Sequence, residues 1–128
     1  MIVEDQVFIA MDLALAVEDA GGEVAGPVAS VKNALALVSE RPIAAAILDF
    51  NLTDGDIAPV AVLLSEAGIP VIIQSGVGVP SDLTDRYPGI VVYNKPYIAA
   101  ALVAELAALV TAKQITALRR RTVNPVKV

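Results

Sequence analysis

Apolar and polar positions alternate along this chain with two periodicities, one typical of strands and one typical of helices. Short apolar runs of strand length recur, and each is bounded by charged residues, glycine or proline. They predict five strands, at residues 1–4, 23–29, 43–48, 70–74 and 90–94. The second is expected to be irregular, because Gly26-Pro27 interrupts it.

Longer segments with helical spacing separate these strands and predict helices over residues 6–20, 30–40, 57–67 and 97–113. Ser30 is a suitable N-cap for the second helix. The first helix is expected to carry Val7, Met11, Ala14 and Leu15 on one face. The inward face of the last helix, which could continue to residue 121, is expected to carry Leu102, Leu106, Leu109 and Val110. Residues 81–87 follow a Gly/Pro-rich segment and predict one or two helical turns, and residues 123–128 are expected to fray.

Strands that alternate with helices indicate an α/β domain, a doubly wound parallel sheet of five strands covered on both faces. Right-handed crossovers place every loop that follows a strand at one edge of the sheet, where ligands of such folds bind. Glu4-Asp5, Asp49, Ser75 and Lys95 all fall at these strand ends. We expect one domain over residues 1–113 and a basic helical extension or tail over residues 114–128.

The amino-acid composition excludes several kinds of chemistry for this domain. The 128 residues are 56% hydrophobic and contain neither Cys nor His. Disulfides, thiolate chemistry, histidine-assisted nucleophiles and a phosphohistidine are therefore excluded, so a phosphoryl group would have to come from elsewhere and sit on another side chain. No apolar run nears the length that crosses a bilayer, and the start does not resemble a signal peptide. These features favour a cytoplasmic protein without a membrane partner.

Charge is unevenly distributed along the chain. The net charge is −5, yet residues 113–128 hold five of the nine bases and none of the fourteen acids. An acidic body disfavours nucleic-acid binding through a broad surface. The segment Arg119-Arg120-Arg121 is typical of a solvated helix end, and a docking role on an anionic surface is the alternative.

The strand-end acids predict a metal site. Glu4, Asp5 and Asp49 would bring three carboxylates together, and like charges at close range repel strongly. Mg²⁺ would relieve this repulsion, since it prefers oxygen ligands and is typically coordinated by carboxylate and phosphate oxygens together. The backbone carbonyl of Asn51 could supply a further ligand.

The same strand ends predict phosphoryl chemistry. Carboxylates form aspartyl-phosphate intermediates, which makes Asp49 the natural nucleophile. Lys95 would act as a point charge toward a phosphoryl oxygen, and Ser75 could donate its hydroxyl to another. Taken singly, each residue has an ordinary explanation in turns or helix-end charge. Their shared position at the ends of different strands of one sheet favours the functional interpretation.

These residues resemble a known pattern, the receiver domain of two-component response regulators, over about residues 1–113. The matching motifs are Val3-Glu4-Asp5, Leu48-Asp49 with Asn51 and Gly55, Gln74-Ser75-Gly76, and Lys95-Pro96-Tyr97. The resemblance implies a flavodoxin-like sheet of order 2-1-3-4-5 in a stand-alone receiver.

The resemblance also implies roles for individual residues. It implies that Asp49 accepts a phosphoryl group from a histidine kinase or a phosphotransfer protein. Glu4 and Asp5 would hold Mg²⁺, with Asp5 as the direct ligand. Ser75 would be the switch hydroxyl, and Lys95 the family's lysine, whose bond to Pro96 is usually cis.

Two departures concern how phosphorylation would be reported. Val92 occupies the position where the family usually has an aromatic switch residue, and Tyr93 is one place later. The fourth helix is expected to be short or disordered. No DNA-binding or enzymatic domain is expected after residue 113, and output is therefore expected to come through a protein partner or a phosphoryl relay. The Ala-rich faces of the last helix could pair two copies or could be core.

Two alternatives stay open from the residues alone. The first is an unphosphorylated protein-interaction module on the same fold, which the absent aromatic and the weak fourth helix favour. The second is a metal-dependent phosphatase with an aspartyl intermediate, for which Asp54 is the only local candidate acid. The receiver would be no enzyme in the usual sense, since it would catalyse only its own phosphorylation and dephosphorylation.

Overall fold

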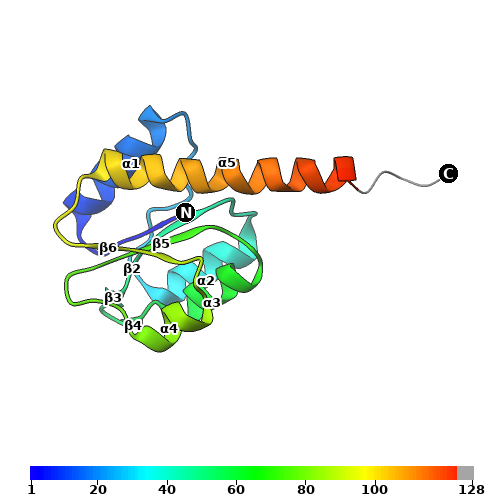
Figure 1. The fold of residues 1–128 in the computed structure, drawn as a ribbon. Helices are drawn as coiled ribbons and strands as arrows, with labels where there is room; N and C mark the ends of the chain where they lie inside the picture. The colour runs from blue at the N-terminus through cyan, green and yellow to red at the C-terminus, as the bar shows by residue number, and fades with distance from the viewer. Residues whose placement is uncertain (124–128) are drawn as a thin grey trace.

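The structure, a computed structural model, describes residues 1–123 and places a parallel sheet between two layers of helices (Figure 1). The sheet has four strands in the order β1 (Ile2–Val3), β2 (Ala46–Asp49), β5 (Val71–Ser75) and β6 (Val91–Asn94). Helices α1 (Val7–Asp19) and α5 (Ala99–Val123) cover one face. Helices α2 (Val31–Glu40), α3 (Ala58–Glu66) and α4 (Ser81–Arg86) cover the other. The predicted α/β class and the short fourth helix are confirmed.

Strands β1, β2 and β5 are buried on both faces because their side chains alternate between two cores. Ile2, Ile47 and Ile72 lie in register across neighbouring strands and pack under α1 and α5. The residues that follow them, Val3, Leu48 and Ile73, pack against α2 and α3 on the opposite face. This double burial explains why the strands are continuously apolar rather than alternating.

The predicted second strand, residues 23–29, is reduced to a single parallel bridge between Val3 and Val28. The Ile2 amide donates to the Ala25 carbonyl at 3.1 Å, and the Val28 amide donates to the Ile2 carbonyl at 3.0 Å. A regular parallel pairing would leave one residue between these two partners, whereas Gly26 and Pro27 both lie between them. When residues 23–29 are counted as the second predicted strand, the five predicted strands keep the expected order 2-1-3-4-5 in the sheet.

Three local predictions differ from the structure. Residues 43–45 precede the strand rather than belong to it, since β2 begins at Ala46. The turn after Asp49 forms a small antiparallel hairpin of β3 (Asn51–Leu52) and β4 (Gly55–Asp56), which was not predicted. The predicted face of α1 is mostly exposed: Val7, Met11 and Leu15 are more than half exposed and only Ala14 packs against the core, whereas Ala10 and Leu13 are buried.

Helix α5 is longer than the sequence pattern required. Its residues Leu102 and Leu106 are buried and Leu109 and Val110 are half-buried, as predicted. The helix then continues past the sheet, and Figure 1 shows its end projecting from the body. By length and composition alone, residues 99–120 of α5 are long and apolar enough to cross a membrane, since one 18-residue window there holds at most two charged residues. Uninterrupted apolar runs alone predicted no such segment.

Helix α2 is capped from two sides. The Ser30 hydroxyl accepts a hydrogen bond from the Asn33 amide at 3.0 Å, as predicted. Asp54, in the turn between β3 and β4, accepts from the Val31 amide at 2.9 Å and from the Lys32 amide at 3.1 Å. These two bonds lower the pKa of the Asp54 carboxyl. Asp54 therefore links the β3–β4 hairpin to the start of α2 through two hydrogen bonds.

We expect Asp54→Ala to lower the melting temperature at pH 7, because two amides at the start of α2 lose their carboxylate acceptor. A carboxyl whose folded pKa is depressed stabilises the protein above its ordinary pKa, and this contribution disappears as pH falls through the folded value. The difference from wild type should therefore shrink below about pH 4. Thermal melts at several pH values measure it, with Asp85→Ala on α4 as the control. A difference that stays constant down to acid pH would contradict this account.

Candidate functional site

The carboxyl ends of β1 and β2 bring three carboxylates together. Glu4 and Asp5 follow β1, and Asp49 is the last residue of β2. One oxygen of each lies within 4.8 Å of the others. Glu4 and Asp49 are buried, whereas Asp5 is half-exposed at the mouth of the crevice.

Lys95 enters the same crevice from the end of β6. Its ammonium lies 3.3 Å from Asp49 Oδ1 and 3.8 Å from Glu4 Oε2. The Lys95 amide donates to the Ser75 carbonyl at 2.9 Å, which fixes the lysine backbone against the end of β5. The Lys95-Pro96 bond is cis, as the family resemblance implied.

Burial dominates the electrostatics of this crevice. It raises the pKa of Glu4 to about 7 against the opposing effect of the Gln6 amide, which donates to Glu4 Oε1 at 3.0 Å. Burial also raises the pKa of Asp49, while the Lys95 ammonium opposes the rise. Three carboxylates against one ammonium leave an excess of negative charge that is poorly solvated.

Gln74 is a site residue that the chemistry of the sequence did not single out. It is fully buried at the position before Ser75, and its side-chain amide donates to Glu4 Oε2. Its carbonyl oxygen and the Tyr97 hydroxyl are buried without a hydrogen-bond partner within residues 1–123. Burial and the nearby carboxylates raise the pKa of Tyr97. A glutamine in an otherwise apolar strand was the available signal, because a buried amide needs partners.

Ser75 reaches the same edge, but its hydroxyl is engaged by its own loop. It donates to the Gly78 carbonyl at 2.8 Å and accepts from the Val77 amide at 3.2 Å. The side chain is 1% exposed, so the hydroxyl is held beside the crevice rather than out in solvent.

The remaining candidates lie around this edge. Asn51 is exposed at the start of β3, two residues beyond Asp49. Val92 is 36% exposed on β6, whereas the Tyr93 hydroxyl donates to Glu105 on α5 at 3.0 Å. Tyr93 therefore lies on the α5 side of the sheet. Asp54 caps α2, which disfavours it as the acid of a phosphatase.

The crevice suits a divalent cation. Its donors are carboxylate oxygens, which Mg²⁺ prefers, and their mutual distances allow two or more to share one ion. The excess negative charge would be offset by such an ion, and half-exposed Asp5 leaves a route for it. We infer that the residues fit Mg²⁺.

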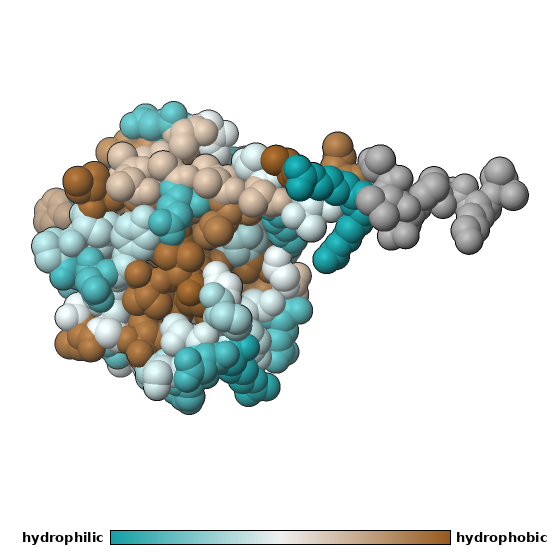
Figure 2. Space-filling model, in the orientation of Figure 1, coloured by the Kyte–Doolittle hydropathy of each residue, from teal (hydrophilic) through white to brown (hydrophobic). Residues whose placement is uncertain are grey.

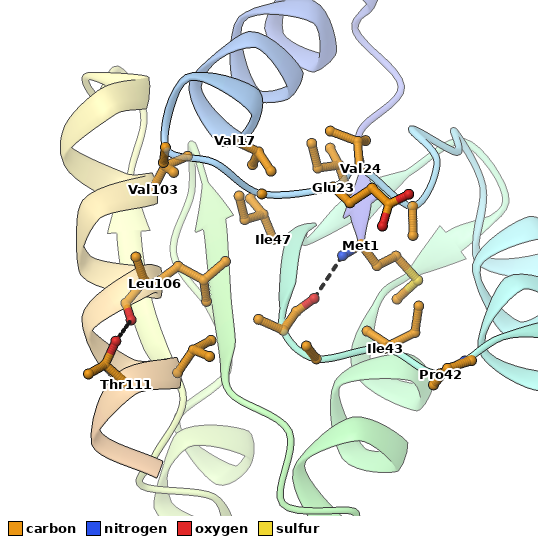
Figure 3. A pocket seen from close by; sticks show the side chains of 18 residues that line it. Met1, Val17, Glu23, Val24, Pro42, Ile43, Ile47, Val103, Leu106 and Thr111 are labelled. Atoms are coloured by element: carbon orange, nitrogen blue, oxygen red, sulfur yellow. Dashed lines mark hydrogen bonds between the residues drawn. The ribbon is translucent and has the colours of Figure 1, made fainter. Parts of the chain in front are cut away.

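A separate cavity lies at the amino ends of the strands, opposite the crevice, and carries no comparable cluster of carboxylates and lysine. It measures about 500 Å³ and lies between α5 and the start of β1 (Figure 3). Its wall is mostly apolar, with Val17, Ile47 and Val103 among the labelled side chains. The Thr111 hydroxyl is used by its own helix, where it donates to the Ala107 carbonyl at 3.0 Å.

Comparison with solved structures agrees with the fold. The chain is 38% identical to SdrG from Sphingomonas melonis Fr1, over 84% of this chain and 92% of that one, with a TM-score of 0.70. It is 28% identical to the response regulator PhyR from Brucella abortus, over 97% of this chain but only 52% of PhyR, with a TM-score of 0.78.

A receiver domain protein (CheY-like) from Methanospirillum hungatei JF-1 has a TM-score of 0.80 at 19% identity, over 90% of this chain and 94% of that one. No protein-family model and no curated protein matches the chain. The fold, the order of its elements and these similarities agree: the chain belongs to the receiver domains of response regulators.

Proposed function

We propose that this chain is a receiver domain that accepts a phosphoryl group on Asp49 from a histidine kinase or a histidine phosphotransfer protein. The observation that carries the proposal is the convergence of Glu4, Asp5, Asp49 and Lys95 in one crevice. In the transfer, an Asp49 oxygen bonds to phosphorus while the phosphorus–nitrogen bond of the donor histidine breaks. The bonding electron pair leaves with that nitrogen.

Each residue of the crevice has a role in this proposal. Asp5, Glu4, Asp49 and the backbone carbonyl of Asn51 would hold Mg²⁺. The ion would supply positive charge beside the phosphoryl oxygens. Lys95, already 3.3 Å from Asp49, supplies a second positive charge where the transferred group arrives.

The Ser75 loop is the proposed reporter of phosphorylation. For its hydroxyl to donate to a phosphoryl oxygen, Ser75 must release the Gly78 carbonyl, since a hydroxyl has one proton to donate. Releasing that bond frees the loop that starts at Gly76 and shifts the population toward a partner-binding state.

The output of this receiver is proposed to be a downstream protein partner in the cytoplasm. The chain carries no DNA-binding element in residues 1–123. One similar structure is described as the anti-anti-sigma factor PhyR from Bartonella quintana, at 24% identity over 48% of that protein. A protein partner is thus the form of output that the similar chains favour.

The test is phosphorylation by acetyl phosphate with and without Mg²⁺, followed by intact mass. We expect the mass of one phosphoryl group to be gained with Mg²⁺ and lost again when the sample stands. Chelation of the metal should prevent the gain. An unchanged mass with Mg²⁺ present would contradict the proposal.

An unphosphorylated interaction module is the second candidate. The engaged Ser75 hydroxyl and the exposed Val92 favour it, because neither side chain is poised to report a phosphoryl group. It predicts no mass gain in the same experiment. A metal-dependent phosphatase predicts steady release of inorganic phosphate from phosphate monoesters, which a phosphoacceptor would not show.

A further inference from the structure

The outer surface between α1 and α5 is hollowed beyond the candidate site. A cavity of about 480 Å³ runs between the two helices. Its floor is apolar, with Leu15, Ile98 and Ala104 in its lining, and Asp12 and Asp19 stand on its α1 side. It shares Ala20 and Val103 with the cavity of Figure 3, so the hollow continues along the α1–α5 boundary. We refer to this hollow as the α1–α5 groove.

The exposed surface of α1, which borders this groove, is both apolar and acidic. Phe8 is 83% exposed, and Met11 and Leu15 are more than half exposed one and two turns further along. Helix α1 contains three acids, Asp12, Glu18 and Asp19, and no base. Its outward face would therefore suit a segment that is apolar and basic.

The end of α5 has that composition. Lys113 lies beside Gly68, where α5 passes the end of α3. The α5 extension, residues 114–123, continues for about 15 Å. Ile115 is 48% exposed, and Arg119 and Arg120 are exposed beyond it. Figure 2 shows hydrophilic and hydrophobic atoms together on this projecting end.

A helical segment of this length gains little stability in water from its own backbone hydrogen bonds. The extension lies beyond every element of its own body in Figure 1, so the α1–α5 groove of the same copy is out of its reach. A second copy, in contrast, presents both an apolar floor for Ile115 and carboxylates for the arginines.

We propose that two copies of this chain pair through antiparallel α5 helices, each placing its α5 extension in the α1–α5 groove of the other. Residues 115–120 of one copy then lie near residues 98–104 of the second, where the groove is lined by Leu15, Asp12 and Asp19. Arg119 and Arg120 face the acids of α1.

The middle of α5 permits this approach. Its exposed face there carries small side chains: Ala104, Ala107, Ala108 and Thr111. Small residues at a crossing let two helix backbones come close together. The arrangement is reciprocal, so it closes as a two-fold dimer and does not grow into a filament.

The first test is the mass of the protein in solution, measured by light scattering after size exclusion over a range of concentrations. Wild type should be a concentration-dependent dimer, and Ile115→Glu should weaken dimerisation by about tenfold or more, since a charge replaces an apolar anchor. Leu63→Glu is the matched control, because Leu63 on α3 is 47% exposed and lies on the opposite face. A wild-type monomer, a dimer that tolerates Ile115→Glu, or equal losses in both variants would overturn the proposal.

A charge exchange tests the partner surface. Asp12→Lys with Asp19→Lys should weaken the dimer, and adding Arg119→Glu with Arg120→Glu should restore it. Wild type should also dissociate as salt rises, because exposed ion pairs are screened. Failure of the second pair to restore the dimer would overturn the assigned groove. Binding to anionic phosphatidylserine vesicles by a monomeric wild type would assign the extension to a membrane surface instead.

Phosphorylation at the candidate site gives an independent check that the Ile115→Glu variant is folded. Acetyl phosphate should phosphorylate Ile115→Glu and wild type at similar rates, because Ile115 lies at the far end of α5 from Lys95. This readout separates failure of the dimer from failure of the proposed phosphoacceptor function.

Discussion

Asp49→Asn should abolish phosphorylation by acetyl phosphate, because an amide oxygen replaces the carboxylate nucleophile at the centre of the crevice. The same substitution should raise the melting temperature in the absence of Mg²⁺. Asp49 is 4% exposed and lies close to Glu4 and Asp5, so its charge is both desolvated and repelled. A neutral side chain of the same size removes this cost and leaves Lys95 with Glu4.

Two measurements together check this expectation. Intact mass should show no phosphoryl adduct, and thermal melts should show a smaller stabilisation by Mg²⁺ than in wild type. Asp56→Asn is the matched control, because it makes the same change at an exposed residue of the neighbouring hairpin. Adduct formation at the wild-type level in Asp49→Asn would refute the assignment of the phosphoacceptor. A lower melting temperature would show that the Lys95–Asp49 ion pair outweighs the repulsion.

The strands and their parallel sheet were predictable from a simple residue pattern, whereas the order 2-1-3-4-5 was implied by the family resemblance. Ile47-Leu48 and Ile72-Ile73 are continuous apolar pairs, which is typical of strands buried on both faces. Once these strands are parallel, their carboxyl ends share one edge. Glu4, Asp49 and Lys95 are then expected at that edge, and in the structure the Lys95 ammonium lies 3.3 Å from Asp49 and 3.8 Å from Glu4.

The buried face of α1 was not predictable from periodicity. The helix is apolar on nearly all sides, so Val7, Met11 and Leu15 fit a core stripe as well as Ala10 and Leu13 do. Packing against α5 decides between the two faces, and that contact joins residues far apart in the chain. Of the apolar residues that this choice leaves exposed, Leu15 lines the groove of the proposed dimer interface.

The hydrogen-bond partners of side chains around the site were also not predictable from the pattern of apolar and polar residues. Ser75 falls at the predicted strand end, but only the conformation of its own loop directs its hydroxyl to Gly78. Asp54 reads as a turn residue, although its carboxylate caps a helix more than twenty residues away. Both contacts depend on where a loop folds back, which local sequence does not specify.

Gly26→Ala should unfold the edge of the sheet beside β1. Gly26 has φ +99, a conformation that side chains rarely adopt, and a Cβ there would lie 2.9 Å from the Ile2 carbonyl and from the Val28 amide. Those two backbone groups are hydrogen-bonded to each other at 3.0 Å. An added methyl group therefore meets backbone on both sides and cannot be accommodated by turning a side chain.

We expect a loss of about 2–4 kcal/mol in the free energy of unfolding, from the strained conformation together with weakened hydrogen bonds to β1. Urea denaturation measures it. Gly21→Ala separates the two causes, because Gly21 has φ +84 with no atom within 4 Å of an added Cβ. It should lose only the conformational part, about 1 kcal/mol. Equal losses in the two variants would show that the edge segment yields freely, and that the pairing of Val28 with β1 contributes little to the stability of the strand that presents Glu4 and Asp5.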